Sequence, residues 1–252
     1  LVAENRRRGK HDREYELEDT GIFDDGRYFD VEGEYAKASP DDLLVQVTAH
    51  NRGTAAAPLV LLPQLWFRNT WAWGRSGPEF PPRPLLARAG PPEAARIRAS
   101  HATLGELVLE ADVSTDDTAP ELLFTGNDTN AARLFGGENA APYVKDAFHE
   151  YVVHGRTEAV DPAGRGTKAG VLYRVTVPAG GSVRVRLRLR ERQHATGDAF
   201  GAGFDAIVAT RIDEADQFYA RRIPAHATDE ERRVARQAYA GLLWSKQFYH
   251  YV

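Results

Sequence analysis

Apolar and polar side chains alternate with a period of two over much of the first 200 residues, and this alternation predicts β-strands with one buried face. The clearest signal covers 171–177 and 183–189, which are separated by a turn rich in proline and glycine. Two such runs in succession predict an antiparallel hairpin. Further strands are expected at 28–35, 43–49, 94–100, 106–113, 122–124 and 151–154.

Residues 59–67 differ from the other strands because both of their alternating sets are apolar, which predicts a strand covered on both faces. Pro63 cannot donate a ladder hydrogen bond, so a bulge or a sheet edge is expected there. The turn that follows presents Trp71 and Trp73. Two indole rings could form a platform for a sugar, or they could seal the end of the sandwich by packing, which we favour.

Near the end of the chain the apolar period changes from two to about 3.6, which predicts two helices. The first covers 204–219 and stops before Pro224, and the second begins at Thr228, where Glu231 completes a capping box. From Tyr239 onward the second helix is apolar on nearly every side, so we expect another domain or a second copy of the chain to cover it. The pattern is typical of a mainly β, antiparallel sandwich followed by two α-helices.

Composition and charge narrow the classes of partner. The 252 residues carry a net charge of −4 and a pI of about 6.1, a balance that predicts neither a nucleic-acid partner nor an anionic membrane partner. The longest apolar runs are too short to span a bilayer. The absence of cysteine excludes disulfides, thiolate metal sites and a cysteine nucleophile. The chain begins at Leu1 without a signal-peptide pattern and contains no methionine, so we expect a fragment of a cytoplasmic protein.

One strand of the predicted hairpin carries arginine at every second position. These arginines are Arg184, Arg186, Arg188 and Arg190. A row of guanidinium groups could bind phosphates, but in a net acidic protein we favour a solvated face that pairs across strands with carboxylates. The carboxylates expected to pair with them lie on the strand at 28–35 and are Asp30, Glu32 and Glu34.

Sequence motifs for catalysis are missing from the chain. It contains no nucleophile elbow, no phosphate-binding loop of the Walker type, no dinucleotide-binding glycine motif and no H-E-x-x-H. The eight histidines are scattered, and no metal site or cofactor is predicted. The polar, glycine-rich and asparagine-rich segment 125–147 is too long for a simple connection, so we expect it to form a functional surface or to dock a partner.

Four segments carry a family resemblance. They are ENRRRGKHDREYELEDTGIFDDGRYFDVEGEYAKASPDD (4–42), LPQLWFRNTWAWG (62–74), LLFTGNDTNAARLFGGENAAPYVKDAFHEYVVHG (122–155) and DEERRVARQAYAGLLWSKQFYHYV (229–252). Together they closely resemble the glucosidase-like, mannosylglycerate-hydrolase-like branch of glycoside hydrolase family 63. The resemblance covers almost the whole chain and consists of long ordered phrases.

The resemblance implies an N-terminal β-supersandwich that precedes an (α/α)6 barrel, in which an acidic pair hydrolyses an α-glycosidic bond with inversion. Residues 1–200 would then form the sandwich, which we expect to lack its N-terminal part. Residues 201–226 would form a linker helix and 227–252 the first barrel helix. The implied partners are the missing barrel and an α-linked glucoside or mannoside. The implied catalytic carboxylates lie outside this chain, so no catalytic residue is assigned.

Two further expectations follow for this family member. Trp244, Gln247 and Tyr251 share one face of the first barrel helix and are the residues most suited to approach substrate, with helix packing as the alternative. The fragment is expected either to associate with itself through 239–252 or to leave its last turns poorly ordered. A free-standing carbohydrate-binding module that uses Trp71 and Trp73 stays open as a second function. We favour the enzyme domain, because an independent module has no use for the apolar helix.

Overall fold

The structure is a computed structural model that describes residues 1–74, 77, 80–91, 94–113 and 119–246. The chain divides into two compact units, Leu1–Phe200 and Gly201–Val252. The first unit consists mainly of antiparallel strands and the second contains two helices. The predicted fold class, mainly β with antiparallel sheets followed by two helices, is therefore confirmed at that level.

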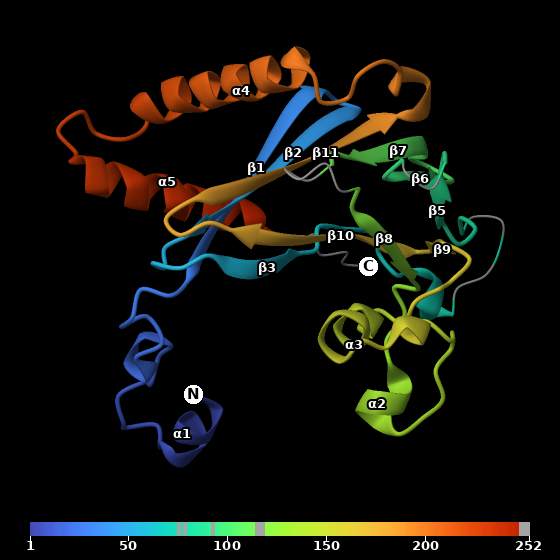
Figure 1. Ribbon diagram of the computed structural model, residues 1–252, viewed down its shortest axis with the longest axis horizontal. Helices are drawn as coiled ribbons and strands as arrows, with labels where there is room; N and C mark the ends of the chain where they lie inside the picture. Colours follow the sequence, from blue (N-terminus) through green and yellow to red (C-terminus); the bar gives the residue numbers. More distant parts are fainter. Residues whose placement is uncertain (75–76, 78–79, 92–93, 114–118, 247–252) are drawn as a thin grey trace. The chain divides into compact units, whose positions relative to one another are not determined.

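The larger sheet of the first unit has seven strands, in the order β1-β2-β11-β7-β6-β5-β9, and neighbouring strands are antiparallel (Figure 1). Their bounds are β1 Phe29–Ser39, β2 Asp42–Asn51, β5 Leu85–Ala89, β6 Arg96–His101, β7 Gly105–Ala111, β9 Arg165–Gly166 and β11 Ser182–Glu191. The alternating pattern of the sequence predicts most of these strands to within a few residues. The short strand β9 has too few residues to show an alternation.

The smaller sheet is built around β10, Lys168–Val177, which pairs antiparallel with three other strands. These are β3 Ala57–Leu61, β4 Gln64–Trp66 and β8 Glu121–Thr125. The expected hairpin between 171–177 and 183–189 is wrong, because β10 belongs to this sheet and β11 to the larger one. The turn between them carries the chain from one sheet to the other.

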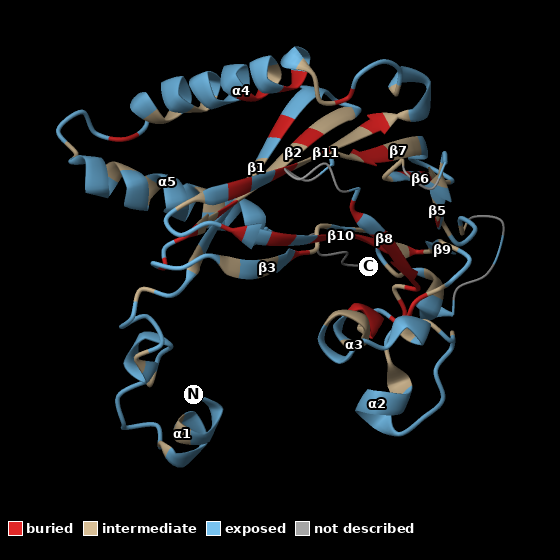
Figure 2. Ribbon diagram, viewed as in Figure 1, coloured by how far each residue is buried: buried red, intermediate tan, exposed pale blue. Residues whose placement is uncertain are grey.

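The hydrophobic core lies between the two sheets and explains this crossing. One apolar cluster contains Leu86 and Ile97 of the larger sheet together with Phe124, Val171 and Tyr173 of the smaller one. Buried residues occur along the strands of both sheets (Figure 2). The alternating valines of β10 and β11 face this shared core from opposite sides, so the two strands stack across it without forming a ladder.

The strand that contains Pro63 is interrupted, as predicted: β3 ends at Leu61, β4 begins at Gln64, and the Pro63 carbonyl accepts a hydrogen bond from Val171 N at 2.9 Å. The expectation that both faces of 59–67 are covered holds on the second face only at Leu62, which packs against the cluster that contains Leu123, Phe148 and Leu172. Val60 and Trp66 of that face are exposed, and the other set faces the core between the sheets. An apolar run alone does not distinguish a doubly covered strand from one that carries apolar side chains at the surface.

The arginines of β11 are paired with carboxylates, but with different ones from those predicted. The pairs are Arg186 with Asp112, Arg188 with Asp42 and Arg190 with Glu110. The predicted acids lie on β1, and β2 separates β1 from β11. The amide of Gln46 links Glu34 to Arg184, because it donates to the Glu34 carboxylate and accepts from the Arg184 guanidinium.

Of the four arginines, Arg184 is exposed, as predicted, but the other three are largely shielded from solvent. The side chains of Arg186, Arg188 and Arg190 are 19%, 12% and 6% exposed. Each donates a further hydrogen bond to a backbone carbonyl of the segment 196–200 that covers them. These guanidinium groups donate to carboxylates and to backbone carbonyls, and so they hold this segment in place. Because these donors are already engaged, the three arginines are unsuited to bind phosphate.

Residues 151–154 are helical, so the predicted strand there is wrong. They end α3, Ala147–His154, which packs Phe148 against Leu123 and Leu172. A short apolar run fits either period, and the packing of its first turn selects the helix. The other short helices of this unit are α1 Val2–Arg7 and α2 Ala131–Phe135, with 3₁₀ turns at Glu18–Thr20, Trp71–Trp73, Thr157–Ala159 and Arg192–His194.

The second unit contains α4, Ala202–Ala220, and α5, Asp229–Trp244. The predicted capping box is confirmed, since the Thr228 hydroxyl accepts from Glu231 N and the Glu231 carboxylate accepts from Thr228 N. The hydrogen bonds that the Thr228 N–H and hydroxyl donate to the Glu231 carboxylate lower the pKa of Glu231. Arg236 of α5 pairs with Asp216 of α4 at 2.5 Å, which joins the two helices. Among the helices of the described residues, none is long and apolar enough to cross a membrane.

Candidate functional site

The candidate site begins at the turn that follows β8. Gly126 N donates to the carbonyl of Tyr143 at 2.9 Å. A Cβ atom at Gly126 would lie 2.5 Å from Asp128 Oδ2 and 2.9 Å from the Tyr143 carbonyl. Glycine is therefore required here, because a side chain would push the Asp128 carboxylate out of its position.

Asn127 ties this turn to the tryptophan loop. Its amide donates to the Phe67 carbonyl at 2.9 Å, and the amide of Asn69 donates back to the Asn127 carbonyl at 3.0 Å. The backbone N–H of Asn127 donates to the Thr167 hydroxyl at 2.7 Å. Three segments that are distant in sequence are thus held together by side-chain hydrogen bonds to the backbone, which fixes both loops at one end of the sandwich.

Asp128 is the centre of the site. It is buried, and its two oxygens accept from Trp71 Nε1 at 2.8 Å and from Arg83 Nη2 at 2.5 Å. The Arg83 guanidinium also lies over the Trp71 ring, 5.0 Å from its centroid. A buried carboxylate needs such partners, because burial without them would cost several kcal/mol. We call Trp71, Arg83 and Asp128 the Asp128 cluster.

A pocket of about 460 Å³ adjoins the Asp128 cluster and shares Arg83 with it, and most of its accessible lining is apolar. The polar groups around it come from the following residues: Arg83, Tyr143, Asp161, Arg165 and Thr167. Carboxylate, hydroxyl and guanidinium groups together can accept from and donate to several hydroxyls of one ligand. A second cavity of about 380 Å³ is lined mainly by aliphatic side chains such as Leu43, Leu61 and Leu187, which suit an apolar occupant and offer a sugar few partners.

The structure separates the predicted site residues. Trp71 is half-buried in the Asp128 cluster with its indole N–H engaged. Trp73 is 49% exposed, and the Arg68 guanidinium lies 5.3 Å from its ring centroid. Trp244 is exposed on α5 in the second unit. Gln247 and Tyr251 lie outside the described residues.

Sequence reasoning missed Asp128 and Arg83. Asp128 stands in the segment 125–147, which its length and polarity mark as functional, but nothing in the alternation distinguishes this acid from its neighbours. Arg83 stands in the proline-rich segment 76–92, for which the sequence predicts a surface segment without helix or central strand. That prediction is wrong for β5, which is paired on both sides. The bonds to Asp128 span 57 residues for Trp71 and 45 for Arg83, and a local pattern carries no information on such distant pairs.

Comparison with known proteins finds a yeast protein whose sequence is similar to this chain. No family model matches the chain. The chain is 38% identical over 286 aligned residues to a protein of Saccharomyces cerevisiae described as uncharacterized protein YMR196W, an alignment that covers 100% of this chain and 26% of the yeast protein. The chain therefore spans about a quarter of the length of this relative.

Proposed function

We propose that this chain is the non-catalytic sandwich domain of an inverting α-glycoside hydrolase and that it supports and borders an (α/α)6 catalytic barrel. The observation that carries the proposal is the apolar surface at the end of α5. Leu242, Leu243 and Trp244 are 71%, 68% and 68% exposed. Soluble proteins seldom expose adjacent large apolar side chains unless another surface covers them, and the neighbouring helices of a barrel would do so.

Two other observations support the proposal. The long phrases of the sequence resemble glycoside hydrolase family 63, in which a supersandwich precedes such a barrel. The yeast relative is about four times as long as the chain, which is enough for a catalytic domain beyond the matched region. We further propose an α-linked glucoside or mannoside as substrate and a cytoplasmic location. Trp244, Gln247 and Tyr251 would then contribute to the rim of the substrate site, with the catalytic carboxylates elsewhere in the longer protein.

The purified chain is expected to show no turnover of aryl α-glucosides or aryl α-mannosides, because an inverting mechanism needs a general acid and an opposed general base. A longer polypeptide that contains this region is expected to hydrolyse one of them with inversion, which proton NMR of the released sugar would show. Turnover by the chain alone that is abolished in Asp161→Asn would contradict the proposal.

A carbohydrate-binding module is the alternative, favoured by the exposure of Trp73 and by the pocket beside Arg83, whose guanidinium lies over the Trp71 ring. Tryptophan fluorescence distinguishes the two functions in the same purified chain. If the chain is a supporting domain, titration with glucose, mannose and their disaccharides leaves the emission unchanged. Saturable quenching that is lost in Trp73→Ala would establish the module instead.

The apolar end of α5 is expected to cause self-association of the isolated chain. Burying one leucine contributes about 1.5–3 kcal/mol, so several such side chains can outweigh the ordering cost of a weak dimer. Light scattering coupled to size exclusion should give a mass that rises with concentration. It should fall to the monomer value when the chain is cut before Tyr239 and in the double variant Leu242→Ser, Leu243→Ser.

The variant Val234→Ser, on the same helix and also exposed, serves as the control. A monomer at all concentrations would remove the main physical support for the proposed barrel contact.

A further inference from the structure

Helix α3 has one side fixed in the protein and another directed to solvent. Ala147 and Phe148 are buried, and Phe148 packs with Leu123 and Leu172. The close approach depends on Gly170 of β10, where a Cβ atom would lie 3.1 Å from the Phe148 ring. The helix is therefore held firmly from beneath, while His149 and His154 are exposed and Glu150 is partly exposed.

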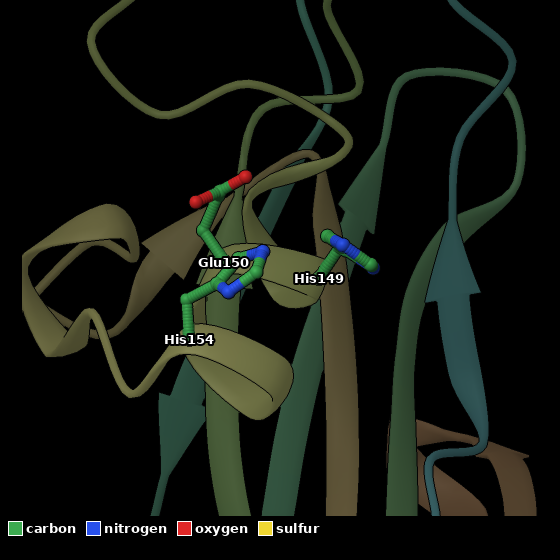
Figure 3. Close-up of side chains that lie close together, drawn as sticks. All are labelled: His149, Glu150 and His154. Carbon is green, nitrogen blue, oxygen red and sulfur yellow. The ribbon is translucent and has the colours of Figure 1, made fainter.

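The three polar side chains converge at the end of this helix (Figure 3). Glu150 and His154 are four residues apart and so lie one turn above each other on the same face. His149 adds its ring from the neighbouring position, with the two imidazole centroids 5.3 Å apart. One ligand atom from each residue lies within 4.8 Å of the other two. Gly155, in the left-handed conformation, ends the helix and donates its N–H to the Glu150 carbonyl.

We propose that His149, Glu150 and His154 bind a divalent transition-metal ion such as Zn²⁺. Two imidazole nitrogens and one carboxylate oxygen form a ligand set that proteins use for zinc, at distances of about 2.0–2.2 Å from the metal. Ligand atoms around one tetrahedral ion are about 3.3 Å apart, as these bond lengths require. The atoms of the three residues, which lie within 4.8 Å of one another, need to approach each other by at most about 1.5 Å, which exposed and partly exposed side chains achieve by small rotations. The site is independent of the proposed glycosidase role.

Arg156 provides a competitor that makes the site testable. Its Nη1 atom lies 2.8 Å from Glu150 Oε2, and its side chain is 62% exposed. A metal ion that binds the Glu150 carboxylate would lie beside this guanidinium, which competes with it for the carboxylate charge and repels it. Removing the charge of Arg156 should therefore tighten metal binding, whereas it would have little effect on a metal held by the two histidines alone.

The test is calorimetric titration of the untagged chain with ZnCl₂, together with the visible absorption of bound Co²⁺. We expect one ion per chain, and an affinity that falls tenfold or more in His149→Ala, in His154→Ala and in Glu150→Gln, since even the loss of an outer partner of a metal ligand costs about 10- to 100-fold. Arg156→Gln should raise the affinity several-fold. The exposed His226 provides the matched control, His226→Ala, which should bind as the unchanged chain does.

Several results would overturn the assignment. Absence of saturable binding, or binding that His149→Ala and His154→Ala leave unchanged, would show that these residues do not hold the ion. Binding that is lost in the histidine variants but is unaffected by both Glu150→Gln and Arg156→Gln would exclude the carboxylate as a ligand. Circular dichroism of each variant separates loss of the site from loss of the fold, and the exposure of both histidines makes the alanine variants compatible with folding.

Discussion

Replacing Glu110 with alanine is expected to lower the free energy of unfolding by about 3–5 kcal/mol, the loss typical when one partner of a buried ion pair is removed. The Glu110 side chain is 4% exposed, accepts a hydrogen bond from Arg190 and forms an ion pair with Arg96 at 2.8 Å. Arg190 is itself only 6% exposed. Without the Glu110 carboxylate, the buried Arg190 guanidinium would lose this ion pair and keep the Thr196 carbonyl as an acceptor. Arg190 Nε has no hydrogen-bond partner among the described residues even when Glu110 is present.

Urea unfolding of Glu110→Ala beside Glu106→Ala measures this effect. Both acids lie on β7, but Glu106 is 44% exposed and its contact with Arg98 is 4.0 Å long. An exposed pair of that kind contributes no more than about 1 kcal/mol. If the two variants lose the same stability, the buried pairing of Glu110 does not hold the arginine face together.

Gly166→Ala is expected to destabilise the first unit by about 3 kcal/mol, at the upper end of the usual cost of overpacking. A Cβ atom on Gly166 would lie 2.1 Å from the Thr125 carbonyl oxygen and 2.7 Å from its carbon. Both are backbone atoms, so no side-chain rotation relieves the clash. Strand β8 must shift at Thr125, immediately before the turn that positions Asp128.

The shift should also be visible at the candidate site. The Trp71 indole N–H donates to Asp128, so its NMR resonance should move in Gly166→Ala together with the fall in the urea midpoint. Gly137→Ala is the matched control, because a Cβ atom there meets nothing within 4 Å, and we expect a change within about 0.5 kcal/mol. A stable Gly166→Ala variant with an unmoved indole resonance would contradict the close approach of β8 and β9.

The Asp128 cluster shows how far site prediction from sequence extends. The concentration of tryptophan in 66–73 directs attention to Trp71 and Trp73, and the segment 125–147 is marked by its length. Neither signal indicates that Asp128 joins the two segments, or that Arg83 completes the group. The sequence pattern also did not indicate the proposed metal ligands, for a related reason. A strand over 151–154 would continue an alternation that places His149 and His154 on opposite faces. The helix that forms instead brings the two side chains together.

The sequence by itself determined the features that depend on neighbouring residues. The alternation predicted the long strands of the larger sheet, Pro63 predicted the interruption between β3 and β4, and Thr228 with Glu231 predicted the start of α5. Each rests on the geometry of a few adjacent peptide units: the period of the side chains, a missing N–H, or a hydrogen bond over one helical turn. Such interactions are the same in any surrounding fold.

Only the tertiary structure decided which elements meet. The alternating residues of β10 and β11 fit a hairpin as well as two strands facing each other across a core, and the second arrangement forms because β10 finds partners in β3, β4 and β8. The arginines of β11 could pair with any nearby acid, and strand order made Asp42, Glu110 and Asp112 their neighbours. Pairing of this kind is set by burial and competition among distant segments, which periodicity in one segment does not record.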